Sequence, residues 1–146
     1  MAKIRYSLIS IILLISTVRM EAQTPSTCFE IQSILVDACG NPEGANEMVR
    51  FIIGPADMNT ADLSINWPNN PYRNICQNAN TASKVAQLNA TIQACGIILE
   101  PVGGILPAGS SVLVVTSEDM DPTFNSFAGL TDTLYMIFQC TGNTQG

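Results

Sequence analysis

The chain has 146 residues, five cysteines, no histidine, and a formal charge of −6 from six basic and twelve acidic side chains. Without histidine it can form neither a Ser/His/Asp or Cys/His nucleophilic site nor a zinc site that uses imidazole. Its acidity argues against a surface that neutralises nucleic-acid phosphates or anionic lipids. These counts exclude several common enzyme classes and predict no nucleic-acid partner.

The first residues follow the order of a secretory signal peptide. Lys3 and Arg5 precede an apolar run of eleven residues, and a more polar stretch then leads to Ala22. A helix that spans a bilayer needs about 20 apolar residues, so this run is too short for one. We predict that residues 1–22 are cleaved off and that residues 23–146, which contain no stable membrane span, are secreted or held at the cell surface. An uncleaved membrane anchor is the alternative.

Removal of this segment makes the chain more acidic. Residues 23–146 hold three basic side chains, Arg50, Arg73 and Lys84, against eleven acidic ones, which gives a formal charge of −8. The apolar residues that remain are enough to close one small core. We therefore expect residues 23–146 to form one folded domain.

The cysteines fit a disulfide-bonded exported chain better than a metal site. No two of them form a Cys-x-x-Cys pair, the usual element of a four-thiolate zinc site. An oxidising compartment permits disulfides. The residues alone leave the pairing open. We favour Cys76 with Cys95, which bracket one local segment, and Cys28 with Cys39, at the two ends of one strand and turn. The odd number leaves one thiol free or paired with a cysteine outside this chain.

Several segments alternate with the period of a β-strand. Strands are expected over residues 28–36, 47–53, 97–100, 111–116 and 133–140, which are separated by turns rich in glycine, proline and asparagine. In the first of them, alternation places Phe29, Ile31 and Leu35 on one side and Ile34 on the other. That pattern predicts a partly covered strand.

Residues 80–94 form the one predicted helix. Their apolar side chains recur at helical spacing, at Val85, Leu88 and Ile92. A polar side chain at Asn80 or Thr81 can cap the start of the helix. Short strands separated by turns, with one inserted amphipathic helix lying over them, predict a mostly β fold of the β-sandwich class.

Trp67, the only tryptophan, has two interpretations. It can plug the core, because a lone tryptophan buries a large area wherever the fold permits. It can also form a stacking platform for a sugar ring together with Tyr72, five residues further on. We favour the first interpretation and keep a carbohydrate-binding module that uses Trp67 and Tyr72 as the alternative.

The densest acidic cluster contains Glu118, Asp119 and Asp121, in a polar link that follows a strand. Oxygen ligands on a loop can hold Ca²⁺, which would suit an extracellular module. The spacing does not match the calcium loop Asp-x-[Asp/Asn]-x-[Asp/Asn]-Gly, and a solvated acidic turn is the commoner outcome. These three residues are kept as candidate ligands for Ca²⁺, and no other cofactor is predicted.

A carboxylate-dependent hydrolase would need two acidic side chains on opposite sides of the bond it cleaves, one with a pKa raised by burial. The candidates on or beside predicted strands are Glu30, Asp37, Glu47 and Glu100. Because eleven acids in 124 residues make some pair inevitable, and because such side chains are mostly exposed, the pairing carries little information. We expect no enzyme and keep the hydrolase as the second alternative.

Three short motifs, in this order, resemble those of the lamin-tail domain: Asn46–Phe51, Asp62–Trp67 and Leu106–Val115. In that family an acidic residue and alternating apolar residues begin a strand, a Leu-Ser-Gly-Trp turn follows, and a Pro-Ala-Gly turn leads into a valine-rich strand. The likeness covers roughly residues 28–146. This chain departs from the family at its second motif, which has an extra residue and no glycine. The helix over residues 80–94 resembles an insertion relative to the simplest form of the domain.

The lamin-tail domain is an immunoglobulin-like sandwich, and its bacterial versions occur in exported, often multidomain surface proteins. The resemblance therefore implies that residues 23–146 are an immunoglobulin-like β-sandwich, incomplete at its C-terminal end, with one inserted helix. It implies no catalytic residues. It also implies attachment, adhesion or spacing. We accordingly expect a non-catalytic interaction or structural module in the N-terminal part of a larger secreted protein, with a protein or glycan partner at the cell surface.

Overall fold

The computed structural model of the protein describes residues 29–39, 42–67 and 71–141. The predicted signal peptide lies outside them. The described residues form eight strands, one α-helix and four short 3-10 turns. The elements are β1 (Glu30–Leu35), β2 (Met48–Ile52), β3 (Met58–Asn59), β4 (Ile75–Cys76), α1 (Ala79–Asn89), β5 (Ile97–Leu99), β6 (Ile105–Leu106), β7 (Ser111–Val115) and β8 (Thr133–Gln139).

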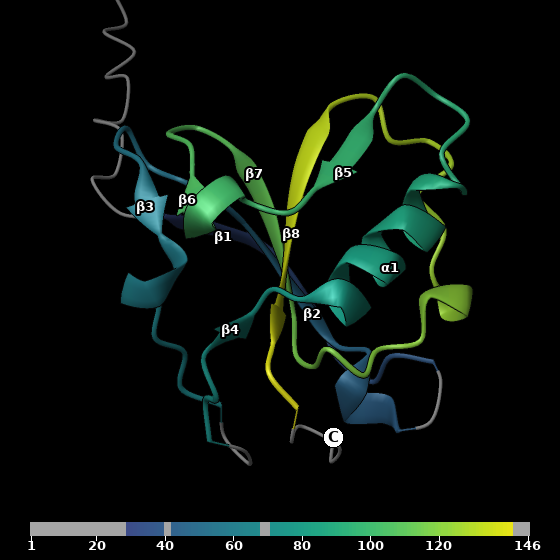
Figure 1. The fold of residues 1–146 in the computed structure, drawn as a ribbon, viewed down its shortest axis with the longest axis horizontal. Helices are drawn as coiled ribbons and strands as arrows, with labels where there is room; N and C mark the ends of the chain where they lie inside the picture. The colour runs from purple at the N-terminus through teal and green to yellow at the C-terminus, as the bar shows by residue number, and fades with distance from the viewer. Residues whose placement is uncertain (1–28, 40–41, 68–70, 142–146) are drawn as a thin grey trace, which may run out of the picture.

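Six of the strands form one mixed sheet in the order β1-β2-β7-β8-β4, with β5 also paired to β8. Neighbours are antiparallel except that β5 and β7 both run parallel to β8. The remaining strands, β3 and β6, form a separate two-stranded sheet. The prediction of a mostly β fold with one helix is confirmed, and the strands are arranged as one large mixed sheet and one small sheet (Figure 1).

Both faces of the large sheet are covered. The helix α1 lies on one face, and β3 and β6 lie on the other (Figure 1). Because successive residues of a strand point to opposite faces, the central strand β7 contributes to two cores. Leu113 and Val115 pack with the helix, whereas Val112 and Val114 pack toward the small sheet. This double burial explains why β7 is an almost continuous run of valine and leucine.

The helix was expected over residues 80–94 and is observed over Ala79–Asn89. Its buried side chains include Val85 and Leu88, as the helical spacing predicts. The N-cap is Asn78, two or three residues earlier than the expected Asn80 or Thr81, and Thr81 completes a capping box with it. Among the described residues, no helix is long and apolar enough to cross a bilayer.

The end of the helix is tied to β5. The side chain of Asn89 makes two hydrogen bonds of 2.8 Å with the backbone of Ile98, one to its carbonyl and one from its N–H. The amide side chain of Asn89 thereby satisfies the backbone N–H and C=O of Ile98, which a neighbouring strand would otherwise pair. The helix stops here because the chain must turn back toward the sheet to pair β5 with β8.

The strand β1 departs from simple alternation because it contains a bulge. Ile31 pairs with Phe51 and Ile34 pairs with Val49, two residues apart on β2, so both isoleucines face the same side. Gln32 is the extra residue. The prediction that Ile31 and Ile34 lie on opposite sides is therefore wrong. The prediction of a partly covered strand is also wrong, because all six residues of β1 are exposed.

The favoured disulfide pairings are not those of the structure, in which Cys76 is bonded to Cys140. Pairing of β4 with β8 places Cys76 opposite Phe138, two residues before Cys140. Cys95 lies beyond the other end of α1, and eleven helical residues extend about 16 Å, too far for a disulfide. Cys95 is instead a free, exposed thiol.

The pairing of Cys28 with Cys39 is not seen either. Cys39 is a free, exposed thiol, and Cys28 lies outside the described residues. The strand β1 runs between the two positions, and six extended residues span about 20 Å. The two ends of β1 are therefore too far apart for a disulfide to join them.

Candidate functional site

An apolar surface follows one edge of the large sheet. The strand β1 is the outermost in the described strand order and pairs with β2 alone. Five large apolar side chains of this segment are 39–61% exposed: Phe29, Ile31, Ile34, Leu35 and Val36. They are half of the ten large apolar side chains that are exposed in the described residues. We call these five residues the β1 edge surface.

The bulge determines which side chains this surface presents. Because Gln32 is the extra residue, Ile31 and Ile34 both project on the side of the sheet to which Phe51 belongs, the side of β3 and β6. At the start of the strand, Phe29 packs on the buried Phe51, with ring centroids 5.1 Å apart and planes tilted by 53°. Contacts with β2 therefore fix the backbone of β1 while its apolar side chains face solvent.

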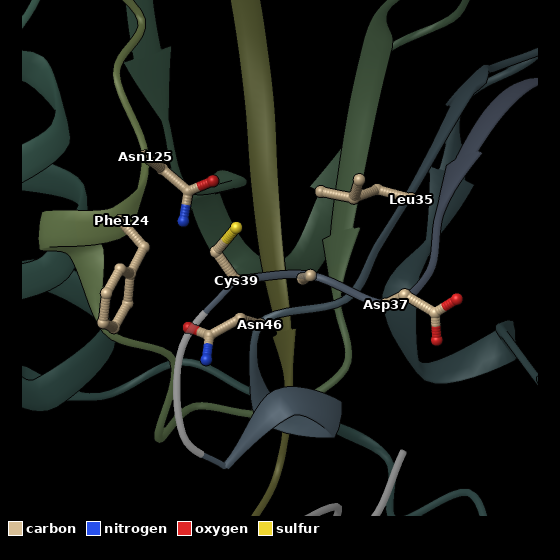
Figure 2. A pocket seen from close by; sticks show the side chains of 7 residues that line it. Leu35, Asp37, Cys39, Asn46, Phe124 and Asn125 are labelled. Atoms are coloured by element: carbon tan, nitrogen blue, oxygen red, sulfur yellow. The ribbon is translucent and has the colours of Figure 1, made fainter.

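An open pocket of about 190 Å³ adjoins the C-terminal end of β1. It is lined by Leu35, Asp37, Ala38, Cys39, Asn46, Phe124 and Asn125. The thiol of Cys39 extends into the pocket, whereas the carboxyl group of Asp37 points away from it (Figure 2). The buried amide of Asn46 donates to the carbonyl of Pro42 and accepts from the N–H of Asp121. Since these bonds hold the loop itself, Asn46 serves the fold rather than a ligand.

Acidic side chains crowd together just beyond β1. Asp37 has a φ of +52°, in the left-handed region that few residues other than glycine adopt. A hydrogen bond with Asp37 is the main cause that raises the pKa of Glu43, and burial and the negative charges of Asp37 and Glu47 add to it. The β1 edge surface thus ends at three neighbouring carboxyl groups.

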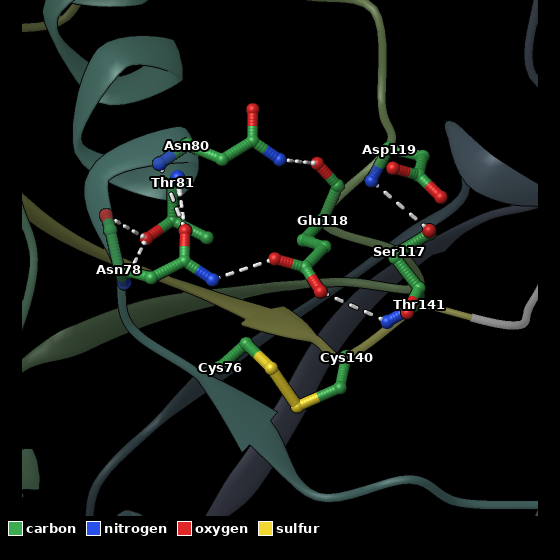
Figure 3. The surroundings of a disulfide bond; sticks show 9 residues. All are labelled: Cys76, Asn78, Asn80, Thr81, Ser117, Glu118, Asp119, Cys140 and Thr141. Atoms are coloured by element: carbon green, nitrogen blue, oxygen red, sulfur yellow. Dashed lines mark hydrogen bonds between the residues drawn. A yellow bond between two sulfur atoms is a disulfide. The ribbon is translucent and has the colours of Figure 1, made fainter.

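Glu118, one of the candidate calcium ligands, is used inside the fold. It is 8% exposed, and its Oε2 accepts a hydrogen bond of 2.7 Å from Nδ2 of Asn78 (Figure 3). Its Oε1 accepts from the backbone N–H of Thr141 at 3.1 Å. Close by, the Cys76–Cys140 disulfide joins β4 to the end of β8 (Figure 3). Glu118 therefore links the helix start to the C-terminal end of the sheet.

The other two candidate ligands are not arranged around a common point with Glu118. Asp121 caps the turn Pro122–Phe124, and hydrogen bonds from Thr123 lower the pKa of its carboxyl group. Asp119 is exposed. Within the described ranges, no group of three or more Cys, Asp or Glu residues is placed to hold a metal ion. The geometry offers no argument for Ca²⁺ at this loop.

Trp67 packs against the core that faces the small sheet. Its Nε1 donates a hydrogen bond of 2.6 Å to Oε1 of Gln139, a residue with no exposed surface. Tyr72 is half-buried, and burial raises the pKa of its hydroxyl. The residues between the two aromatics include 68–70, which lie outside the described part of the chain. Trp67 is thus partly buried at the margin of this core, and its use as a sugar platform is not tested by these contacts.

Of the four carboxylates considered for a hydrolase, Asp37 and Glu47 lie at one end of the β1–β2 pair, whereas Glu30 and Glu100 lie elsewhere on the sheet. Glu30 and Asp37 lie at opposite ends of β1, and Glu47 directly precedes β2. Glu100 follows β5, which pairs with β8 rather than with β1 or β2. Of the four, only Asp37 lines the pocket described above. These positions do not bring two carboxylates to either side of one pocket.

The sequence did not reveal the β1 edge surface, because alternation reports which side chains share a face but not whether that face is covered. The run Ile34-Leu35-Val36 was the available signal, since three consecutive apolar residues interrupt the alternation. No protein-family model, no curated protein and no solved structure matches the chain.

Proposed function

We propose that the chain is an exported, non-catalytic interaction module that binds a protein partner at the cell surface through the β1 edge surface. The observation that carries this proposal is the gathering of five exposed apolar side chains along one sheet edge, three on β1 and one directly before and after it. Contiguous exposed apolar surface is uncommon on soluble proteins and marks interaction sites. An edge strand also presents unpaired backbone N–H and C=O groups, which another chain can bind.

A disulfide within the domain supports its export. The Cys76–Cys140 disulfide fits an oxidising compartment, and the expected signal peptide provides a route to one. The mostly β fold, with the valine-rich β7 after the turn at residues 107–110, is compatible with the lamin-tail resemblance. Within this proposal the domain is a lamin-tail-like, immunoglobulin-like module of a larger secreted protein that takes part in adhesion or surface machinery.

The proposal is tested by disabling the surface in cells that export the protein. Ile31→Lys combined with Ile34→Lys places two charges on the exposed edge without touching either core. The control is Ile97→Lys, the same type of substitution at an exposed isoleucine of β5. The strand β5 pairs with β8, away from β1. Antibody detection on intact cells and in the medium measures how much protein is retained at the surface.

We expect the double variant to keep the wild-type thermal midpoint but to be released into the medium, because its partner no longer binds. The control variant should be retained like the wild type. If the double variant is folded and retained as well as the control, the β1 edge surface does not mediate attachment and the proposal is wrong. A loss of folding is recognised by circular dichroism, and Ile34→Thr, an uncharged polar change, then replaces the double variant.

A further inference from the structure

The β1 edge surface lacks residues that usually keep sheet edges from pairing. Residues 29–36 contain neither proline nor lysine, and Glu30 is their only charged residue. Edge strands of soluble proteins are commonly protected by such residues or by bulges. The bulge of β1 does not protect it in this way, because it brings Ile31 and Ile34 to the same exposed side. Among the described residues no strand pairs with the outer side of β1, so this side can accept an additional strand.

The ends of this edge are acidic. Glu30 begins β1, and Asp37 follows its last residue by two positions. Because Leu35 pairs with Met48, Glu47 lies at the same end of the β1–β2 pair as Asp37, and Glu43 lies in the turn Glu43–Ala45 that leads into β2. The chain thus carries three carboxyl groups around the C-terminal end of the edge, against one at the N-terminal end, and the proximity of Asp37 and Glu47 raises the pKa of Glu43. A positive charge placed there would relieve their mutual repulsion.

The three basic residues of residues 23–146 lie on β2, before β4 and on α1, and none of them is among the causes that shift the pKa of Glu43. Arg50 of β2 donates from Nε to the hydroxyl of Ser111 at 3.1 Å. Lys84 of α1 donates to the carbonyl of Met120 at 2.7 Å. Arg73 precedes β4, at the opposite edge of the sheet. The negative charge beyond β1 is therefore left for a partner to neutralise.

We propose that the β1 edge binds an extended apolar strand of another protein that carries lysine or arginine at its N-terminal end. This inference rests on the proposed function and specifies the chemistry of the partner. Antiparallel pairing, the more stable arrangement per residue, places the N-terminal end of the partner strand beside the C-terminal end of β1. Its basic side chain then lies beside Asp37 and Glu43, and its apolar side chains cover Ile31 and Ile34.

A second copy of this chain fits the same edge less well. In an antiparallel pair of two β1 strands, Glu30 of one copy approaches Asp37 of the other. Like charges on adjacent strands destabilise the pairing. Each copy also carries a formal charge of −8 over residues 23–146, which adds long-range repulsion. The charge distribution favours a basic partner over a homodimer.

Three synthetic peptides test this proposal against protein purified after export, with its disulfide intact and its free thiols alkylated. The first, Lys-Lys-Val-Thr-Val-Thr-Val-Thr, carries its charge at the N-terminal end. The second has glutamate in place of both lysines, and the third has the lysines but a central proline that prevents strand pairing. Fluorescence anisotropy of the labelled peptides measures the dissociation constants at low and physiological salt.

We expect the lysine peptide to bind about ten-fold more tightly than the glutamate peptide, with a difference that shrinks as salt rises. The proline peptide should lose most of the binding. Ile34→Lys in the protein should weaken binding of the lysine peptide, and Ile97→Lys should not. Asp37→Asn should reduce the preference for lysine over glutamate, since it removes one of the charges that the lysines meet.

Several results would overturn the proposal. These are no binding of the lysine peptide, equal binding of the lysine and glutamate peptides, or binding that survives Ile34→Lys. A dimer in sedimentation velocity that Ile34→Lys dissolves would show instead that a second copy occupies the edge. If surface retention in cells depends on Ile31 and Ile34 while all peptides fail to bind, the module function stands and the assigned partner chemistry is wrong.

Discussion

Asn78 joins the start of α1 to the buried carboxylate of Glu118. Its side-chain oxygen accepts hydrogen bonds from the N–H groups of Asn80 and Thr81, at 2.8 and 3.2 Å. Its amide nitrogen donates to Oε2 of Glu118 at 2.7 Å (Figure 3). Asparagine serves both partners because it carries an acceptor and a donor on one group. Aspartate caps helices equally well but has no donor for Glu118.

We predict that Asn78→Asp destabilises the protein at neutral pH, although asparagine and aspartate are equivalent caps elsewhere. The new carboxylate would face Glu118, and like charges in a partly buried site repel. Asn78→Ala should cost about 1–2 kcal/mol because it removes the cap, and it also removes the donor to Glu118. Urea unfolding followed by circular dichroism measures both. At about pH 4 the aspartate variant should recover more stability than the alanine variant, because only the aspartate variant has two facing carboxyl groups that can share a proton.

Asn59 provides the matched control for this prediction. It caps the short turn Thr60–Asp62 by accepting from the N–H of Ala61 at 2.9 Å, and it is exposed. Asn59→Asp should change the free energy of unfolding by no more than about 0.5 kcal/mol, the usual range at exposed positions. An equal loss at Asn59 and Asn78, or a loss at Asn78→Asp that does not depend on pH, would contradict the assigned role of Glu118.

The second prediction concerns the Cys76–Cys140 disulfide, which closes a loop across 64 positions of sequence. A crosslink over a loop of this length reduces the entropy of the unfolded chain by an amount equivalent to about 4 kcal/mol. Replacing both cysteines with serine should lower stability by up to this amount, and reducing agent should then have no further effect. Cys95→Ser is the control, since that thiol is free and exposed. Peptide mapping that links Cys76 to Cys95 would contradict the pairing.

The longer elements of the fold were predictable from the sequence because each repeats its signal several times. The helix showed its period at Val85, Leu88 and Ile92, and β2, β7 and β8 are largely apolar over five to seven residues. The strands β3, β4 and β6 have two residues each, too few to show any period. The disulfide depends on β4, so its correct pairing could not be predicted without that strand.

The candidate site was less predictable than the fold. A single extra residue, Gln32, decides that Ile31 and Ile34 share a face, and nothing in the local sequence distinguishes a bulge from continued alternation. Exposure of β1 depends on its place at the end of the strand order, which is a property of the whole sheet. Conversely, Glu118 looked like a solvated acid in the sequence but is buried. Its burial could not be predicted, because its partner Asn78 lies 40 positions earlier.

The third prediction concerns Trp67 and Gln139. The indole Nε1 donates to Oε1 of the fully buried Gln139, while Nε2 of the same amide has no partner within the part of the chain that the structure describes. Trp67→Phe keeps an aromatic ring but leaves both ends of that amide unsatisfied, which should cost about 1–3 kcal/mol. Gln139→Met in the same background removes the unsatisfied amide at similar volume and should restore part of the loss. If the double variant is less stable than Trp67→Phe alone, the hydrogen bond is not the source of the cost.

The fourth prediction follows from the carboxyl groups beyond β1. The pKa of Glu43 is raised above its usual 4.5 in the folded chain, chiefly by its hydrogen bond with Asp37. A carboxyl group whose folded pKa exceeds its unfolded pKa binds its proton more tightly when folded, so stability falls as pH rises through this interval. Glu43→Gln should therefore raise the thermal midpoint at pH 7 and leave it unchanged near pH 3, where both forms are neutral. Glu100→Gln, on the loop after β5, is the control for the loss of one negative charge away from this cluster. A Glu43→Gln variant less stable than the wild type at pH 7 would mean that the ionised group is held by a favourable contact, and that the acidic end of β1 is already neutralised within the protein.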